Sequence, residues 1–194
     1  MLERIRRCAT GRNVGIALVI FVTFLCAMNI AATLFYKSTG GYGILDLGGG
    51  ANLFAERGGY TPAEAYRLIK HYGESGIHRY YALLVADTFF PPTLGTFAVL
   101  TIVWALTRLK QKRSGFYALA LIPVAYTIAD WSENIGIITL LTNYPHELLF
   151  VARATNIARG IKNVLADISV ELTLTMSAMA LLSYFWGKYP RRRH

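Results

Sequence analysis

The sequence predicts an all-α protein, a polytopic membrane four-helix bundle with a short interfacial helix on its outer side. Hydrophobic residues make up 54% of the 194 residues and charged residues only 16%, whereas a soluble domain has about 25% charged residues. Four apolar segments are each long enough to cross the ~30 Å hydrocarbon core of a bilayer. This composition argues against a soluble enzyme, a disordered chain and a disulfide scaffold.

The four predicted spans belong to a single membrane domain, residues 1–194. The first span carries no formally charged side chain, and the other three carry five of the eleven acidic residues between them. The remaining sequence is too polar or too short for a fifth span. In chain order, the spans are 14–36, 80–107, 116–142 and 164–186.

The long loop between the first two spans changes character along its length. Its first part, residues 40–50, is glycine-rich and predicts a flexible connector. A helix is then expected over 61–73, because Thr61 suits an N-cap, Pro62 suits the first turn, and Glu64 is placed to complete a capping box. Its apolar residues recur on one face, which is typical of a helix at the outer membrane surface.

The basic residues predict the orientation. Twelve of the 20 Lys and Arg lie before the first span, between the second and third spans, or after the fourth. Positive residues in short loops stay on the cytoplasmic side. We therefore expect a multi-pass integral membrane protein with both termini cytoplasmic, or on the matrix or stromal side in an organelle. The same pattern explains the net charge of +9 without nucleic-acid binding.

The acids within the spans are the strongest functional signal. Acidic residues inside a membrane are costly, and they usually face the interior of a bundle. Spacings of three and four residues place the acids of the third and fourth spans on one side of each helix. We therefore expect one polar cavity between the second, third and fourth spans, opening to the outer side. The acids are Asp87, Asp130, Glu133, Asp167 and Glu171.

Roles for the residues around this cavity follow from their chemistry. Asp87, Asp130 and Glu133 are the candidate catalytic residues, because buried carboxyls can carry ligand polarity or transfer protons. The histidines at 71, 78 and 146 lack a paired metal-binding spacing, so we expect no metal site and no cofactor. The candidate ligand-binding residues are Asn134, Trp131, Asp167, Glu171, Arg79, Arg159 and Lys162.

Three short motifs carry a resemblance to a known group of proteins. They are Gly-Tyr-Thr-Pro at 59–62, Asp-Trp-x-Glu-Asn at 130–134 and Tyr-Pro at 144–145. With them, most of the chain resembles uncharacterised small four-span membrane proteins. The resemblance implies this architecture, and no activity is attached to it.

Three hypotheses about function follow. The first is binding, with or without chemical transformation, of a small amphipathic or lipid-like molecule in an acidic outer-leaflet cavity. The second is a structural or assembly subunit of a larger membrane complex. The third is ion or proton translocation, although the inner half of the spans has almost no ionisable residues for a relay. The expected partners are membrane lipids, a small lipophilic ligand, and other membrane proteins or a second copy of the chain.

Overall fold

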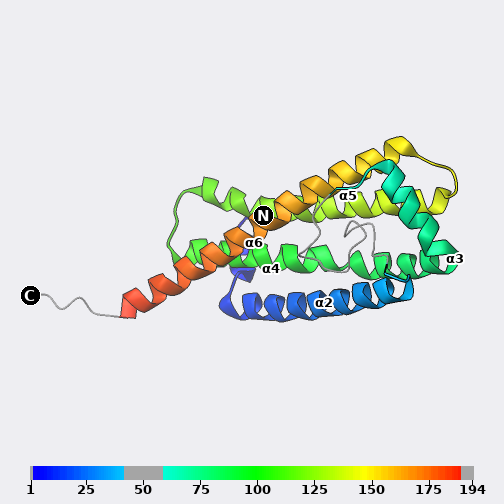
Figure 1. Ribbon diagram of the computed structural model, residues 1–194. Helices are drawn as coiled ribbons and strands as arrows, with labels where there is room; N and C mark the ends of the chain where they lie inside the picture. Colours follow the sequence, from blue (N-terminus) through cyan, green and yellow to red (C-terminus); the bar gives the residue numbers. More distant parts are fainter. Residues whose placement is uncertain (1, 42–58, 189–194) are drawn as a thin grey trace, which may run out of the picture.

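The computed structural model describes residues 2–41 and 59–188, and within these ranges the chain is all-helical with no strand. Helices α2, α4 and α5 run along the length of the molecule, while α6 crosses them obliquely and projects beyond them at its C-terminal end (Figure 1). The prediction of an all-α fold is confirmed. The elements are α1 (Leu2–Cys8), α2 (Gly11–Ser38), α3 (Pro62–Asp87), α4 (Phe90–Arg108), the 3-10 helix η2 (Ser114–Leu121), α5 (Ile122–Asn143) and α6 (Leu149–Lys188).

Three helical segments among the described residues are long and apolar enough to cross a membrane, where the sequence predicted four spans. They are Gly11–Ser38, Pro62–Arg108 and Leu149–Ser183. Helix α5 lies where the third span was expected, but its polar residues lower its hydropathy. The span expected over 116–142 also begins with a 3-10 segment, because regular α-helix starts only at Ile122.

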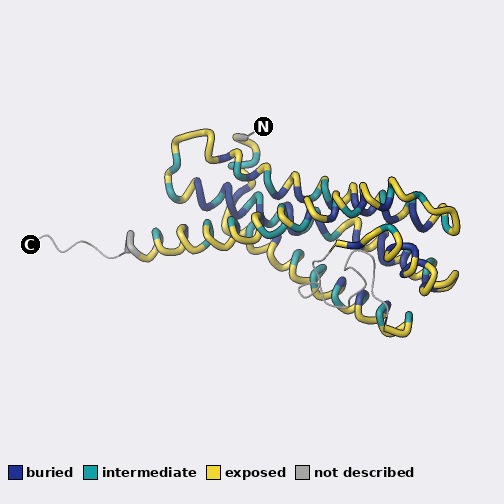
Figure 2. Tube along the Cα trace, turned by 45° about the horizontal axis from the view of Figure 1, so that its top comes forward, coloured by how far each residue is buried: buried dark blue, intermediate teal, exposed yellow. Residues whose placement is uncertain are grey.

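Helix α2 lies at the side of the bundle and packs along one narrow stripe. Its N-cap is Thr10, whose side chain accepts a hydrogen bond from the Asn13 amide at 3.2 Å. The ring of Phe35 packs against Tyr72 and Tyr80 of α3, both with centroids 5.3 Å away. The rest of this apolar helix is largely exposed (Figure 2).

Helix α3 begins with the predicted capping box, since Thr61 and Glu64 bond reciprocally. The expected surface helix over 61–73 does not stop there. Gly73 adopts a positive φ of 59°, which glycine tolerates because it lacks a Cβ, and the chain turns sharply and continues as helix. The first part of α3 therefore lies across the end of the bundle, and the second part runs in line with α4 (Figure 1).

The helix break falls inside the predicted second span, at Thr88 and Phe89, and separates α3 from α4. Pro91 and Pro92 cause it, because neither has an N–H for the carbonyl four residues earlier. One of those carbonyls, Thr88 O, accepts a hydrogen bond from Trp131 Nε1 at 3.0 Å instead. The break makes Asp87 the last residue of α3.

Helix α6 starts earlier than predicted, at Leu149, so most of the loop expected over 143–163 is helical. The span predicted over 164–186 is thus the later part of a 40-residue helix. Residues 144–148 connect α5 to α6, which run antiparallel. The buried residues of α6 recur at spacings of three, four and seven, as in a coiled-coil seam. On α6, these are Ala152, Thr155, Arg159, Lys162, Ser169, Thr173 and Ala180.

Candidate functional site

A buried polar cluster joins three helices in the middle of the bundle. Asp87 comes from α3, three residues come from α5, and two basic residues come from α6. All are buried: Glu133 is 0% exposed and Arg159 is 2% exposed. We call this set the polar cluster, and its residues are Asp87, Asp130, Glu133, Asn134, Arg159 and Lys162.

The polar cluster lies between two hydrophobic clusters. Along α3 and α4, Asp87 lies between Leu84 of the first cluster and Ile102 of the second. Along α6, Arg159 and Lys162 lie between Ala152 of the first and Leu172, which packs against the second. The charges are therefore enclosed by apolar packing along these helices.

Lys162 is the centre of the ionic contacts. Its Nζ lies 2.5 Å from Glu133 Oε2 and 3.7 Å from Asp130 Oδ2. The antiparallel seam explains this geometry, because Asp130 and Glu133 on α5 are one turn apart and face the same part of α6. An ion pair removed from water interacts far more strongly than an exposed pair, but both charges lose their hydration.

Asn134 connects Asp87 to the rest of the cluster. Its Nδ2 donates to Asp87 Oδ2 at 2.8 Å and lies 3.4 Å from Asp130 Oδ1. The amide thereby shares its two hydrogens between carboxylates of α3 and α5. A continuous chain of contacts runs from Asp87 through Asn134 and Asp130 to Lys162 and Glu133.

Arg159 extends the cluster towards the start of α3. Its guanidinium carbon lies 5.8 Å from the centroid of the Tyr60 ring. The Tyr60 amide also donates to Asn156 Oδ1 at 3.0 Å, one turn before Arg159 on α6. These contacts attach the segment preceding α3 to the same face of α6.

Chemically, the polar cluster is suited to holding helices in register. It contains three carboxyl groups and two basic side chains, all buried, and the contacts of Lys162 and Asn134 with the carboxyl groups cross between helices or lie within α5. Removing one partner of such a pair leaves a buried charge without compensation, which is strongly destabilising. The cluster therefore links α3, α5 and α6 through buried polar contacts.

Other residues predicted for the site lie elsewhere. Arg79 and Glu171 are exposed, and Asp167 is half-buried. Trp131 is 42% exposed and lies beside the polar cluster without belonging to it. Arg79 and Glu171 are exposed because they fall off the buried stripes of α3 and α6. For Glu171, the i, i+4 spacing with Asp167 predicted the cavity side of the helix, and the structure differs.

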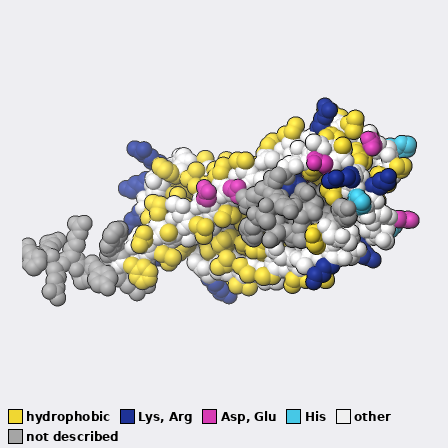
Figure 3. All heavy atoms as spheres, in the orientation of Figure 1, with side chains coloured by type: hydrophobic (Ala, Val, Ile, Leu, Met, Phe, Trp, Pro, Cys, Tyr) yellow, Lys and Arg dark blue, Asp and Glu magenta, His cyan; other side chains and the backbone are white. Residues whose placement is uncertain are grey.

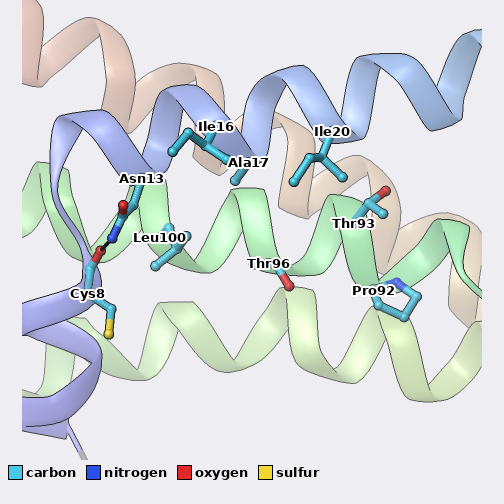
Figure 4. A pocket seen from close by; sticks show the side chains of 9 residues that line it. All are labelled: Cys8, Asn13, Ile16, Ala17, Ile20, Pro92, Thr93, Thr96 and Leu100. Atoms are coloured by element: carbon cyan, nitrogen blue, oxygen red, sulfur yellow. Dashed lines mark hydrogen bonds between the residues drawn. The ribbon is translucent and has the colours of Figure 1, made fainter.

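Two adjoining cavities lie along α4. One has a volume of about 400 Å³ and lies between α2 and α4, with Cys8 at its end (Figure 4). The other has a volume of about 620 Å³ and is lined by α1, α4 and α5. We call them together the α4 groove, since they share the lining residues Cys8, Pro92, Thr96 and Leu100.

The walls of the α4 groove are mainly apolar. Thr93 Oγ1 donates to Phe90 O at 2.7 Å. Asn13 Nδ2 donates to Cys8 O at 2.7 Å (Figure 4). Thr127 Oγ1 donates to Pro123 O at 3.1 Å. Because these polar groups bond to backbone carbonyls, they offer few free donors to a ligand.

The polar cluster and the α4 groove do not share lining residues. Asp87, Asp130 and Glu133 line neither of the two cavities, whereas the predicted ligand-binding residue Trp131 lines the larger one. The sequence does not predict the groove. Pro92, Thr96 and Leu100 share one face of α4 at four-residue spacing, but any lipid-facing helix has residues at this spacing.

The chain offers no cluster typical of a metal centre in the part that the structure describes, where no three His, Cys, Asp or Glu residues come together to hold an ion. Both cysteines, Cys8 and Cys26, are free and exposed. In comparisons with known proteins, no family model, no curated protein and no solved structure matches this chain.

Proposed function

We propose that this chain is an integral membrane protein that binds a small amphipathic, lipid-like molecule in the α4 groove. The membrane setting is supported by the three long apolar helices. It is also supported by the face shown in Figure 3, where many exposed hydrophobic side chains lie between Lys and Arg that gather towards the two ends. Such apolar exposure would favour aggregation in water.

The observation that carries the binding proposal is the groove itself. A cavity of about 620 Å³ falls within the range of small-molecule sites, which are concave and mostly apolar. Its lining comes from three helices, including Thr96 of α4 and Trp131 of α5. An apolar chain fits these walls, and a sugar or nucleotide would find few partners there.

In this proposal, the buried carboxylates have a structural role. Asp87, Asp130 and Glu133 hold helices together through Lys162 and Asn134. The ligand is therefore assigned to the groove and not to an acidic outer-leaflet cavity. With the N-terminus on the cytoplasmic side, the α1 end of the groove lies in the cytoplasmic leaflet.

Filling the groove tests this assignment. Thr96→Trp places a large side chain on the groove floor, and Thr33→Trp is the matched control, because Thr33 is exposed on α2 and lines neither cavity. The proteins are reconstituted with phosphatidylcholine and phosphatidylglycerol, extracted in mild detergent, and weighed by native mass spectrometry. We expect a retained lipid on the wild type and on Thr33→Trp, and its loss from Thr96→Trp.

The same spectra address the alternative of an assembly subunit. One observation favours that alternative, namely that only 11% of the most apolar window of α2 is buried, leaving a face that another subunit could cover. Native mass spectrometry of protein purified from its own membrane would then show foreign subunits in fixed stoichiometry. Equal lipid retention by Thr96→Trp and the wild type would contradict the binding proposal.

A further inference from the structure

The α4 groove has a charged residue at its α1 end. Arg4 lines the larger cavity, and it has no ion-pair partner among residues 2–41 and 59–188. The neighbouring Arg6 is used differently, because its guanidinium stacks over the Tyr117 ring at 4.1 Å. Arg4 therefore offers an available guanidinium at the end of an otherwise apolar site.

The groove floor runs away from this charge along α4. Pro92, Thr96 and Leu100 lie at successive four-residue steps on one face of the helix and span about 12 Å at 1.5 Å per residue. This shape matches an extended hydrocarbon chain. A molecule that fills it and reaches Arg4 needs an apolar chain at one end and a negative charge at the other.

The groove is open at its sides. Ile16 on the α2 edge is 48% exposed, and Ile128 on the α5 edge is 57% exposed. A membrane lipid can therefore enter laterally from the bilayer, without leaving it for water. This opening favours a lipid of the surrounding leaflet over a ligand delivered from solution.

We propose that the α4 groove binds one acyl chain of an anionic phospholipid, with Arg4 contacting its headgroup. This inference rests on the proposed function and adds the ligand class to it. Arginine suits a phosphate because its planar guanidinium can donate two parallel hydrogen bonds. The location of Arg4 agrees with the cytoplasmic N-terminus that the basic flanking residues predict, since anionic lipids concentrate in the cytoplasmic leaflet.

Competition between lipids tests the charge preference. The full-length protein is equilibrated in mixed micelles of equal phosphatidylglycerol and phosphatidylcholine, and native mass spectrometry records both adducts on the same molecules. We expect the wild type to prefer phosphatidylglycerol. Arg4→Gln should lower the preference about fivefold, the contribution of one basic residue near an anionic surface. Arg4→Glu should lower it further.

Arg7→Gln is the matched control, because Arg7 is exposed on the same helix and lines neither cavity. An unchanged preference in Arg7→Gln supports the inference, and an equal fall in both variants overturns it in favour of general surface charge. Circular dichroism and gel filtration check that each variant is folded, which is expected for these exposed side chains.

The two proposals fail in different ways. If the wild type binds both lipids equally and Thr96→Trp loses both, the anionic preference is wrong and the groove still binds lipid. If the wild type retains no lipid, or if Thr96→Trp retains as much as the wild type, the proposed function is wrong and the inference fails with it.

Discussion

The polar cluster and the α4 groove meet on α5, where consecutive residues belong to different regions. Asp130 is buried towards α6 and contacts Lys162, while Trp131 lies on the other side and lines the groove. The polar cluster is charged and buried. The groove is open and mainly apolar, its Thr93, Thr127 and Asn13 side chains bond to backbone carbonyls, and Arg4 lies at one end of it.

Stability and ligand binding therefore depend on different regions of the molecule. A buried ion pair costs desolvation, so it is useful where each partner fixes the position of the other. An empty groove costs little free energy when its polar side chains already bond to backbone carbonyls. Substitutions in the polar cluster should therefore alter the free energy of unfolding, and substitutions that fill the groove should alter lipid retention.

Lys162→Met should have the largest effect. It leaves Glu133, which is fully buried, without the Nζ that lies 2.5 Å away. Removing one partner of a buried pair costs about 3–5 kcal/mol. We expect a fall of this size in the free energy of unfolding, measured by reversible unfolding in mixed detergent micelles.

Two comparisons identify the cause of this loss. Arg153→Met removes an exposed cation from the same helix and should change the free energy of unfolding by no more than about 0.5 kcal/mol. The double variant Lys162→Met/Glu133→Leu removes both charges and should recover part of the loss. A single variant as stable as the wild type would contradict a structural pair.

The sequence predicted the residues of the polar cluster better than the helix boundaries around them. Acids in apolar segments are conspicuous, and their helical spacing placed Asp130, Glu133 and Asn134 on one face, where the structure has them. Arg159 and Lys162 also belong to the buried polar cluster, because α6 begins at Leu149 and includes both residues. The predicted span begins only at 164, since the basic and polar residues in 149–163 resemble a loop when hydropathy alone defines the spans.

Asn134→Leu should have the next largest effect. It removes the donor at 2.8 Å from Asp87 Oδ2, and hydrogen bonds to charged groups contribute about 1.5–3 kcal/mol. Leucine also removes a buried Oδ1 that has no hydrogen-bond partner among the described residues. We therefore expect a net loss of about 2 kcal/mol in the free energy of unfolding.

The matched control is Ser132→Leu on the same helix. Ser132 is exposed and donates to the Ile128 carbonyl within α5, so its replacement should be nearly neutral. Equal losses in the two variants would mean that Asn134 has no special role in joining α3 to α5.

Gly136→Ala tests how closely the seam is packed. A Cβ at Gly136 would overlap the Thr155 side chain of α6, whereas a Cβ at Gly160 would meet nothing within 4 Å. Overpacking costs about 1–3 kcal/mol, and alanine regains up to about 1 kcal/mol of helix propensity. Gly136→Ala should thus lose about 1 kcal/mol in the unfolding measurement, and Gly160→Ala should gain slightly. Two equal gains would show that the seam is loose.

The groove could not be predicted from the sequence, for a physical reason. Its lining residues, such as Thr96 and Leu100, are also ordinary residues of a lipid-facing helix. Whether these residues line a groove depends on the spacing of α2 and α5, which is set by how each of the two helices packs on α4. The helix break at Thr88 and Phe89 has a local cause in the sequence, because Pro91 and Pro92 cannot donate to the carbonyls four residues earlier. That Trp131 bonds to the Thr88 carbonyl depends on the packing of α5 against α4.

Trp131→Phe should have the smallest effect on stability, and it tests the boundary between the two regions. Phenylalanine keeps an apolar wall for the groove but removes the Nε1–H bond to Thr88 O. A partly exposed hydrogen bond of this kind contributes about 0.5 kcal/mol, the low end of the usual range. We expect unchanged lipid retention and faster hydrogen exchange at the amides of Thr88 and Phe89. Loss of lipid with unchanged exchange would instead make Trp131 a ligand contact and leave the helix break independent of it.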